Sequence, residues 1–501
     1  MKNKLLKKAT ALCLIGLMTL SLVACGASKA PGGMTNSGMA MIGGSGESYT
    51  EIVENAFVNV SDTPDSYFSI DANTASYPNL RSMINQGTVN IPKDAVRVEE
   101  MLNYFDYDYQ TPTDGSVLSL NASLFDTPYN RQTKLLTVGL AAEKVEFSGV
   151  KNNIVFLLDV SGSMYSADKL PLVQQAFMLL TENLNPEDRV SIVTYAGEDR
   201  VALSGAYGYE KQKIMAVIED LYAGGSTAGS KGIETAYSLA EQYFIEGGNN
   251  RVILATDGDF NVGVSSVEGL ENLIAEKRQS GVYFSVFGVG HGNIQSDKME
   301  TLALKGNGIY SYIDSVKEAK RALVEGIGGS IVTVANDVKA GITFNPEYVE
   351  AYRLIGYENK LLTEDEFNDS NTDAGELGSG HTVSVVYELK MTDRGLEQGQ
   401  NIAEVVIKYK PTENVGGDGS TEKQLTLAVG TECYHQTLTD TDLFIASVVE
   451  FALLLRDSEY KANADLNALI NRLSALDLAN DEFKSEFRDI VRLYRDNLQK
   501  Q

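Results

Sequence analysis

Short apolar runs alternate with segments of helical periodicity between residues 153 and 323, and this pattern constrains the fold most. The runs are almost uninterrupted, as in strands that are covered on both faces. The segments between them place apolar residues three and four apart, which predicts amphipathic helices. Because strands that alternate with helices form parallel sheets, we expect a doubly wound, mostly parallel α/β domain. The expected strands are residues 154–158, 190–195, 252–255, 283–289 and 309–313, and the expected helices are residues 171–184, 211–221, 232–244 and 267–279.

Two regions of different patterning flank this segment. The preceding region is mixed, with a helical pattern at 94–105 and strand patterns at 117–125 and 134–141. In the following region, alternating stretches between residues 334 and 429 predict an antiparallel β unit that contains an acidic loop at 363–380. The C-terminus is predicted to be helical, with two apolar faces formed by Phe444, Val448, Phe451 and Leu455, and by Phe483, Phe487, Ile490 and Tyr494.

The N-terminus has the pattern of a secretory signal. Four lysines within the first eight residues precede an apolar run at 11–23, which is short for a membrane-spanning helix. The run ends in Leu-Val-Ala-Cys, which resembles a bacterial lipobox, and this resemblance implies lipid attachment at Cys25. We therefore expect the protein to be anchored by lipid at the extracytoplasmic face of the cell membrane.

Charge and composition narrow the possible partners. The chain carries 42 Lys and Arg against 68 Asp and Glu, a formal charge of −26. Removal of a signal with four lysines and no acids would bring this to −30. Such a surface disfavours nucleic acid and attracts cations. Since only three cysteines and three histidines are present, we do not expect a zinc cluster. We expect oxygen ligands for any bound metal.

The most informative residues follow the expected strands. Asp159, Ser161 and Ser163 form an Asp-x-Ser-x-Ser loop directly after the first strand of the α/β segment. Thr227 lies in a Gly-Gly-Ser-Thr loop, and Asp257 follows the third strand. Ligands of doubly wound sheets bind at the carboxyl ends of the strands, so we expect these residues to meet in one crevice. Their hard oxygen donors suit Mg²⁺ best, with Mn²⁺ or Ca²⁺ as alternatives.

These residues carry a family resemblance. The segment 153–324 resembles a von Willebrand factor A domain, and the five residues above match its metal-ion-dependent adhesion site (MIDAS) one by one. The resemblance implies that the hydroxyls and carboxylates hold a divalent cation, directly or through water, and that a carboxylate of a partner completes its shell. Residues 68–77 (FSIDANTASY), 98–105 (VEEMLNYF), 352–359 (YRLIGYEN) and 451–457 (FALLLRD) further resemble the flanking regions of a group of bacterial von Willebrand factor A lipoproteins.

The resulting expectation is a lipid-anchored protein-binding module that captures an Asp or Glu side chain of a protein partner through a bound cation. An alternative is a structural or regulatory component of an envelope assembly, in which the metal only stabilises the fold. A metal-dependent hydrolase is less favoured, because the five residues include no spare general base, so no enzymatic activity is expected. The expected divisions are residues 1–24 (signal peptide), 25–49 (flexible tether), 50–149 (N-terminal region), 150–326 (von Willebrand factor A domain) and 327–501 (C-terminal extension).

Overall fold

The computed structural model describes residues 47–145, 150–225, 230–258, 267–292, 294–325 and 332–500. The predicted signal, Cys25 and most of the predicted tether lie outside these residues. Within the described part of the chain, no helix has the length and hydrophobicity needed to cross a bilayer.

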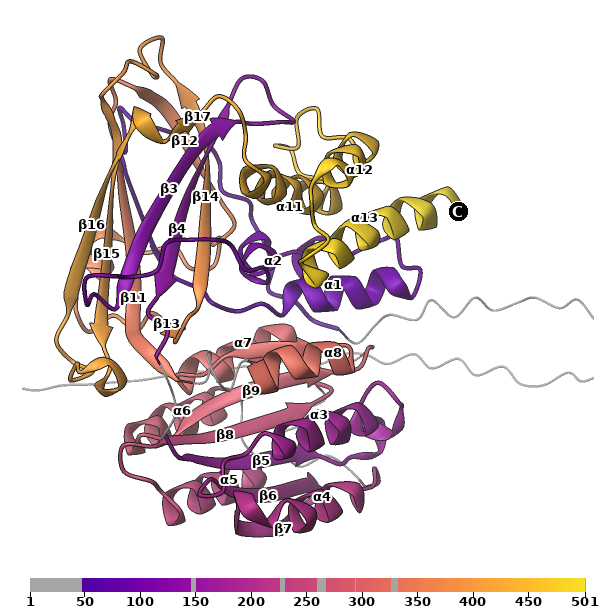
Figure 1. Ribbon diagram of the computed structural model, residues 1–501. Coiled ribbons are helices and arrows are strands. Elements are labelled where there is room, and N and C mark those ends of the chain that lie inside the picture. Colours follow the sequence, from indigo (N-terminus) through magenta and orange to yellow (C-terminus); the bar gives the residue numbers. More distant parts are fainter. Residues whose placement is uncertain are drawn as a thin grey trace, which may run out of the picture. The chain divides into compact units, whose positions relative to one another are not determined.

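The central segment forms a sheet with the strand order β10-β9-β8-β5-β6-β7, in which every neighbouring pair is parallel except β6 and β7 (Figure 1). This confirms the predicted doubly wound α/β fold. The antiparallel edge strand β7 was not predicted, because its charged, largely exposed first half conceals the strand pattern. The strands are β5 (Asn152–Asp159), β6 (Arg189–Ala196), β7 (Glu198–Tyr207), β8 (Asn249–Thr256), β9 (Tyr283–Val289) and β10 (Tyr310–Ile313).

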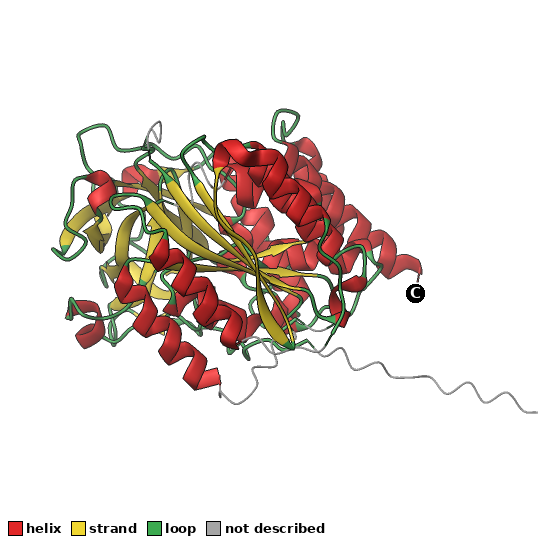
Figure 2. Cartoon of the chain, turned by 90° about the horizontal axis from the view of Figure 1, so that it is seen from below, coloured by secondary structure: helices red, strands yellow, loops and turns green. Residues whose placement is uncertain are grey.

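Helices cover both faces of this sheet, as Figure 2 shows for the twisted strands and the helices on either side. Alternate residues of β5 explain the arrangement: Ile154, Phe156 and Leu158 enter one apolar cluster, whereas Val155 and Leu157 enter another. The first cluster contains α3 (Leu170–Glu182), α4 (Lys211–Glu219), α8 (Val316–Ala319) and the π-helical η5 (Lys320–Glu325); the second contains α5 (Ser230–Gln242), α6 (Val267–Lys277) and α7 (Ser296–Lys305).

The two flanking regions build their sheets together. One sheet has the order β1-β12-β14-β4-β3-β17, so it contains strands from before and from after the α/β domain side by side. In Figure 1 the purple β3 and β4 accordingly lie beside the orange β14. The second sheet has the order β13-β11-β15-β16, and the early strand β2 pairs with β11. The bounds are β1 (Val58–Asn59), β2 (Asp65–Ser69), β3 (Leu118–Asp126), β4 (Lys134–Ala142), β11 (Thr333–Phe344), β12 (Val349–Ile355), β13 (Gly375–Gly378), β14 (Thr382–Met391), β15 (Asn401–Pro411), β16 (Lys423–Gly430) and β17 (Tyr434–His435).

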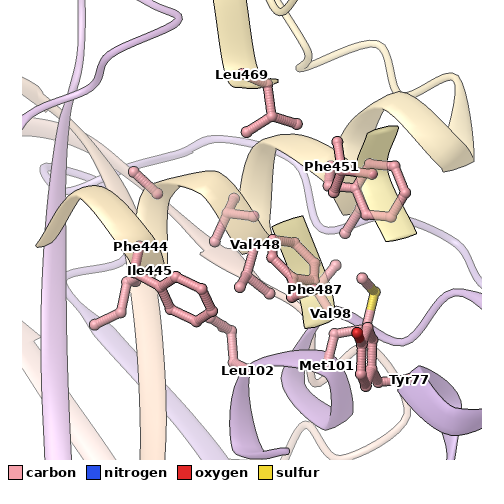
Figure 3. Packing of buried hydrophobic residues seen from close by; sticks show 14 of the residues in the cluster. Tyr77, Val98, Met101, Leu102, Phe444, Ile445, Val448, Phe451, Leu469 and Phe487 are labelled. Carbon is pink, nitrogen blue, oxygen red and sulfur yellow. The ribbon is translucent and has the colours of Figure 1, made fainter. Parts of the chain in front are cut away.

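Helices from both ends of the chain share a further apolar cluster, in which Tyr77 and Met101 meet Phe444, Phe451 and Phe487 (Figure 3). The predicted C-terminal helices are confirmed, and both of their apolar faces contribute to this cluster. The helices are α1 (Ser76–Asn85), α2 (Val98–Asn103), α11 (Asp440–Arg456), α12 (Leu466–Ala475) and α13 (Glu482–Lys500).

Two local predictions need correction. The helical pattern at 94–105 is divided into a 3₁₀ turn, η1 (Lys93–Ala95), and α2, because Val96 and Arg97 leave the helical region and the Arg97 N–H donates to Ser76 Oγ (3.0 Å). The acidic loop at 363–380 is also partly ordered. It contains β13 and a short helix, α10 (Glu364–Asn368), whose start is capped by Thr363 and Glu366.

Candidate metal centre

The candidate centre lies at the carboxyl ends of two neighbouring parallel strands. Asp159 is the last residue of β5, and Asp257 directly follows β8, with which β5 pairs. Both carboxylates are almost completely buried, with exposed fractions of 0% and 1%. The structure thus brings these two predicted residues to the same edge of the sheet, as expected for a ligand site in this class of fold.

The loop after β5 is organised around the Asp159 carboxylate. The backbone N–H of Ser161 donates to Asp159 Oδ1 (2.8 Å), and the hydroxyl of Thr256 donates to Oδ2 (3.1 Å). The hydroxyl oxygens of Ser161 and Ser163 lie 3.0 Å apart. These contacts place both predicted serines next to the buried carboxylate, with Ser161 buried and Ser163 half-buried.

The loop that contains the fifth predicted residue is held against the same place. Gly224 N–H donates to the carbonyl of Val160 (2.8 Å), and Gly162 N–H donates to the carbonyl of Gly225 (3.2 Å). Gly225 has a φ of +92°, and a Cβ there would lie 3.1 Å from the carbonyl oxygen of Ala196, so glycine suits this position. Thr227 itself lies outside the described residues, and its place in the site stays a prediction.

A buried ammonium group contacts the second carboxylate, and this contact was not predicted from the sequence. Lys169 Nζ lies 2.7 Å from Asp257 Oδ2, and only 7% of Lys169 is exposed. Burial, followed by the charge of Asp257, raises the pKa of Asp159 to about 6, although hydrogen bonds from Ser161 and Thr256 oppose the shift. Among the described groups named here, two carboxylates thus face one ammonium, which leaves negative charge in a poorly solvated position.

The donor set fits a hard divalent cation. Two carboxylates and two hydroxyls converge within one loop cluster, and such oxygen ligands are the ones that Mg²⁺, Mn²⁺ and Ca²⁺ prefer. A cation would offset the burial of the Asp159 carboxylate and its repulsion by Asp257, which together raise the pKa of Asp159. Asp159, Ser161, Ser163 and Asp257 are the described residues that would hold it.

Two exposed aromatic side chains belong to the loops that carry the predicted site residues. Tyr165 ends the short 3₁₀ turn that contains Ser163, and Tyr222 precedes Gly224 by two residues. Their exposed fractions are 82% and 79%. Exposed tyrosines are common at protein interfaces, because the ring offers apolar area and the hydroxyl a hydrogen bond.

A second group of acids was not foreseen from the sequence. Oxygen atoms of Asp71, Glu100 and Glu300 lie within 4.8 Å of one another, and all three residues are buried. Two cations partly compensate the three acids: Lys360 Nζ lies 2.9 Å from Glu300 and 3.3 Å from Asp71, and Arg97 lies 3.4 Å from Glu300. The acids come from the N-terminal flank and the α/β domain, and Lys360 comes from the C-terminal flank, so we interpret the group as a buried ion-pair network rather than a metal site.

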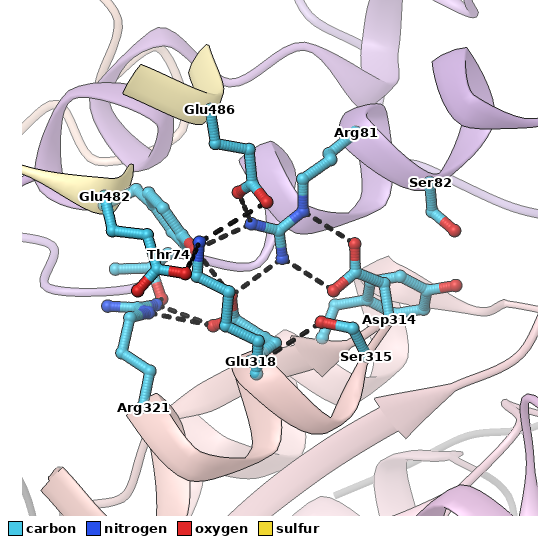
Figure 4. A network of polar contacts seen from close by, with 12 residues as sticks. Thr74, Arg81, Ser82, Asp314, Ser315, Glu318, Arg321, Glu482 and Glu486 are labelled. Atoms are coloured by element: carbon cyan, nitrogen blue, oxygen red, sulfur yellow. Dashed lines mark hydrogen bonds and ion pairs between the residues drawn. The ribbon is translucent and has the colours of Figure 1, made fainter. Parts of the chain in front are cut away.

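Arg81 of α1 forms a second network of this kind (Figure 4). Its guanidinium contacts Asp314 (2.6 Å) and Glu318 (2.9 Å) of the α/β domain and Glu486 (2.6 Å) of α13. Arg81 is buried, and the acids around it raise the pKa of its guanidinium despite burial. The network therefore ties the α/β domain to helices from both flanks.

A serine and a histidine also meet beside these contacts. Ser82 Oγ and His291 Nε2 share a hydrogen bond of 2.8 Å, and His291 Nδ1 lies 3.3 Å from the hydroxyl of Tyr312. A serine hydrolase needs a carboxylate at that second ring nitrogen to orient the imidazole. In this protein the hydroxyl of Tyr312 lies at that nitrogen instead of a carboxylate, and Ser82 is buried. We therefore interpret the Ser82–His291 pair as a structural contact.

Comparisons with known proteins identify the domain that carries the site. Residues 153–324 match the family model of the von Willebrand factor type A domain, and residues 44–137 match a model described as von Willebrand factor. The α/β domain is therefore a von Willebrand factor type A domain. Residues 329–496 match the model "Uncharacterized protein YfbK, C-terminal", so a YfbK-like C-terminal domain follows it.

Among curated proteins, the chain is similar to uncharacterized protein YfbK of Escherichia coli (strain K12), with 40% identity over 389 residues. The match covers 76% of this chain and 66% of the relative, slightly less than two thirds of its length. Inter-alpha-trypsin inhibitor heavy chain H3 of Homo sapiens is 26% identical over 210 residues, which cover 40% of this chain and 23% of that protein. A solved structure, von Willebrand factor type A from Catenulispora acidiphila, has 16% identity and a TM-score of 0.42, and covers 77% of this chain and 91% of its own.

Proposed function

We propose that the chain is a protein-binding module that holds a divalent cation in the crevice at the carboxyl ends of β5 and β8, and through it captures an acidic side chain of a protein partner. The von Willebrand factor type A domain supports the general class, because such domains serve as protein-interaction modules and commonly bind a divalent metal. Asp159, Ser161, Ser163, Asp257 and, by prediction, Thr227 hold the cation, which is Mg²⁺ in the first instance.

The observation that carries this proposal is the pair of buried carboxylates at one edge of the sheet. Asp159 and Asp257 are almost inaccessible to water, and their mutual repulsion contributes to the raised pKa of Asp159. A protein core that needed only stability would avoid such a pair. The two neighbouring serine hydroxyls add oxygen donors without adding charge, so a bound divalent cation would keep part of its charge for a carboxylate from outside.

The surroundings of the crevice suit a protein partner. A chain with a formal charge of −26 repels acidic partners, and a local cation reverses that repulsion at one point. Tyr165 and Tyr222, in the two loops that carry Ser163 and Gly224, provide exposed apolar area for such a partner. We further propose that lipid attachment at Cys25 holds the module at the extracytoplasmic face of the cell membrane, on the strength of the lipobox-like sequence alone.

Calorimetric titration of the purified full-length protein with MgCl₂ and MnCl₂ tests the metal site. Asp159→Asn preserves the shape of the side chain and removes its charge, so we expect it to abolish binding. Asp188→Asn is the matched control, because Asp188 is equally buried but accepts hydrogen bonds from Asn152 and Asn185 near the opposite end of the same sheet. Equal metal affinity of the Asp159→Asn variant and the unaltered protein would refute the site.

A structural or regulatory role in an envelope assembly is the second candidate, and the buried ion pairs favour it. The Arg81 network and the Lys360 network connect the α/β domain to both flanks, so the flanks could present the main contacts. In that case EDTA would lower the unfolding temperature without preventing partner capture. A crosslinking pull-down from intact cells, with and without EDTA, separates the two: loss of crosslinked partner in EDTA supports capture through the metal.

A metal-dependent hydrolase is the weakest candidate. Asp257 is paired with the buried Lys169, and Asp159 accepts hydrogen bonds from Ser161 and Thr256. Among the described residues of the proposed site, neither carboxylate is thus placed as a free general base, and we propose no catalytic role for the site.

A further inference from the structure

The contact between Lys169 and Asp257 suggests how the affinity of the proposed metal site is set. The ammonium lies 2.7 Å from a carboxylate oxygen that belongs to the proposed ligand set. Both groups are buried, with side-chain exposures of 9% and 0%. An ion pair in such a place is not the loose surface contact that a long lysine side chain usually makes, because water cannot easily replace either partner.

The path of the Lys169 side chain is built into the fold. Lys169 is the residue that precedes α3, so its backbone is fixed where the helix begins. Its side chain crosses Gly290, where a Cβ would overlap Lys169 Cγ and Cε. Gly290 has a φ of +74°, and its carbonyl accepts a hydrogen bond from the hydroxyl of Tyr312 (2.8 Å). The glycine therefore provides a groove that guides the lysine toward Asp257.

The charges make the ammonium and a divalent cation competitors. Asp159 and Asp257 together carry two negative charges when ionised, and Lys169 already compensates one of them. A divalent cation that shares Asp257 would repel the ammonium at close range in a poorly solvated site. Ser166 and Ala167, which shortly precede Lys169 in the chain, are exposed, so this segment lies at the protein surface, and we take that side as the one to which the displaced ammonium moves.

We propose that Lys169 is a tethered cation that occupies Asp257 and must be displaced when the divalent metal binds, so that this lysine lowers the metal affinity of the site. This inference rests on the proposed metal site and adds to it a residue that acts against binding. The opposing interpretation is that Lys169 orients Asp257 for the metal. The two interpretations predict effects of opposite sign when the ammonium is removed.

The first test is calorimetric titration of the full-length protein and its Lys169→Met variant with MgCl₂ and MnCl₂. Methionine keeps the unbranched apolar side chain and removes the charge. We expect the variant to bind about tenfold more tightly or better, because the metal no longer has to break a buried ion pair. A residue that orients a ligand would instead give about 10–100-fold weaker binding when it is removed.

Lys151→Met is the matched control. Lys151 makes an ion pair of the same length, 2.7 Å to Glu187, but it is half exposed and immediately precedes β5, at the opposite end of the strand from Asp159. Its removal should leave the metal affinity unchanged. Equal or weaker binding by Lys169→Met would overturn the inference, and the proposed site would stand if Asp159→Asn still abolished binding. Absence of binding by every variant would overturn both.

The second test needs no substitution and therefore does not depend on the folding of a variant. Acetylation of the unaltered protein by an amine-specific reagent, read by mass spectrometry, reports how accessible Lys169 is. We expect its labelling to rise several-fold when saturating MgCl₂ replaces EDTA, whereas labelling of the exposed Lys151 stays constant. Unchanged or reduced labelling of Lys169, at a MgCl₂ concentration that calorimetry shows to be saturating, would overturn the inference.

Discussion

Replacement of Asp159 by asparagine should stabilise the metal-free protein at neutral pH while it abolishes stabilisation by Mg²⁺. The Asp159 carboxylate is buried, and its pKa is raised to about 6 from an ordinary value of 3.8. An acid whose pKa is higher in the folded state than in the unfolded state binds protons more strongly when folded. Stability is therefore present at low pH and is lost as the pH rises from about 4 to 6, after which the loss is complete.

The size of this effect follows from the two pKa values. Their separation corresponds to about 3 kcal/mol at neutral pH, since each pH unit between them is worth about 1.4 kcal/mol. Asparagine carries no charge and can still accept the hydrogen bond from the Ser161 N–H, so the substitution removes most of this penalty. For a domain of the size of the α/β domain, residues 150–326, about 3 kcal/mol corresponds to a rise of roughly 6–12 °C in unfolding temperature.

Differential scanning calorimetry in EDTA at pH 5 and pH 7.5, and then in excess MgCl₂, measures the prediction. We expect the variant to be more stable than the unaltered protein in EDTA at pH 7.5, to show a smaller advantage at pH 5, and to be insensitive to MgCl₂. The Asp188→Asn control should keep its response to MgCl₂. An Asp159→Asn variant that is less stable in EDTA at pH 7.5 would refute the view that the buried charge is a cost carried for binding.

Three further predictions concern other parts of the structure. Arg81→Met leaves two carboxylates of the α/β domain buried without their partner, so urea denaturation should show a loss of about 3–5 kcal/mol. Burial, and then the charge of Glu358, raises the pKa of Glu99 to about 7. Ionisation of Glu99 should therefore reduce the stability of the protein as the pH rises from about 4.5 to 7. Glu99→Gln should flatten this pH dependence in thermal scans between pH 4.5 and 8. Gly290→Ala should destabilise the protein by about 1–3 kcal/mol, and by less when Lys169→Ala is also present, because removal of the lysine side chain removes the overlap; equal losses in both backgrounds would contradict the groove.

The α/β sheet could be predicted because each of its parallel strands is a separate apolar run, and burial on both faces makes such runs conspicuous. The same reasoning located Asp159 and Asp257, since residues that follow parallel strands share one edge of the sheet. Lys169 could not be found in this way. It lies 88 positions from Asp257 in the sequence, and only the start of α3 and the groove at Gly290 direct its side chain there.

The pairing of strands between the two flanking regions could not be predicted from the sequence either. Alternating patterns indicate that strands exist but not which strands pair, and β14 pairs with β4 across the whole α/β domain. The buried acids around Lys360 gave no signal either. Asp71, Glu100 and Glu300 are scattered through the chain, and each is an ordinary acidic residue until folding removes its water.

The pairing of the flanks determines how a binding event in the crevice can be accommodated. The chain leaves the flanking sheets after β4, at Ala142, and returns to them with β11, at Thr333, so the α/β domain is an insertion that is tied at both ends. Separation of the domain from α1 would break the buried contacts of Arg81, at a cost of about 3–5 kcal/mol. Exchange of the Lys169 ammonium for a divalent cation puts one positively charged partner of Asp257 in the place of another, so the Asp257 carboxylate stays paired. The exchange is therefore the less costly response, and we expect metal binding to rearrange the start of α3 while the Arg81 network stays closed.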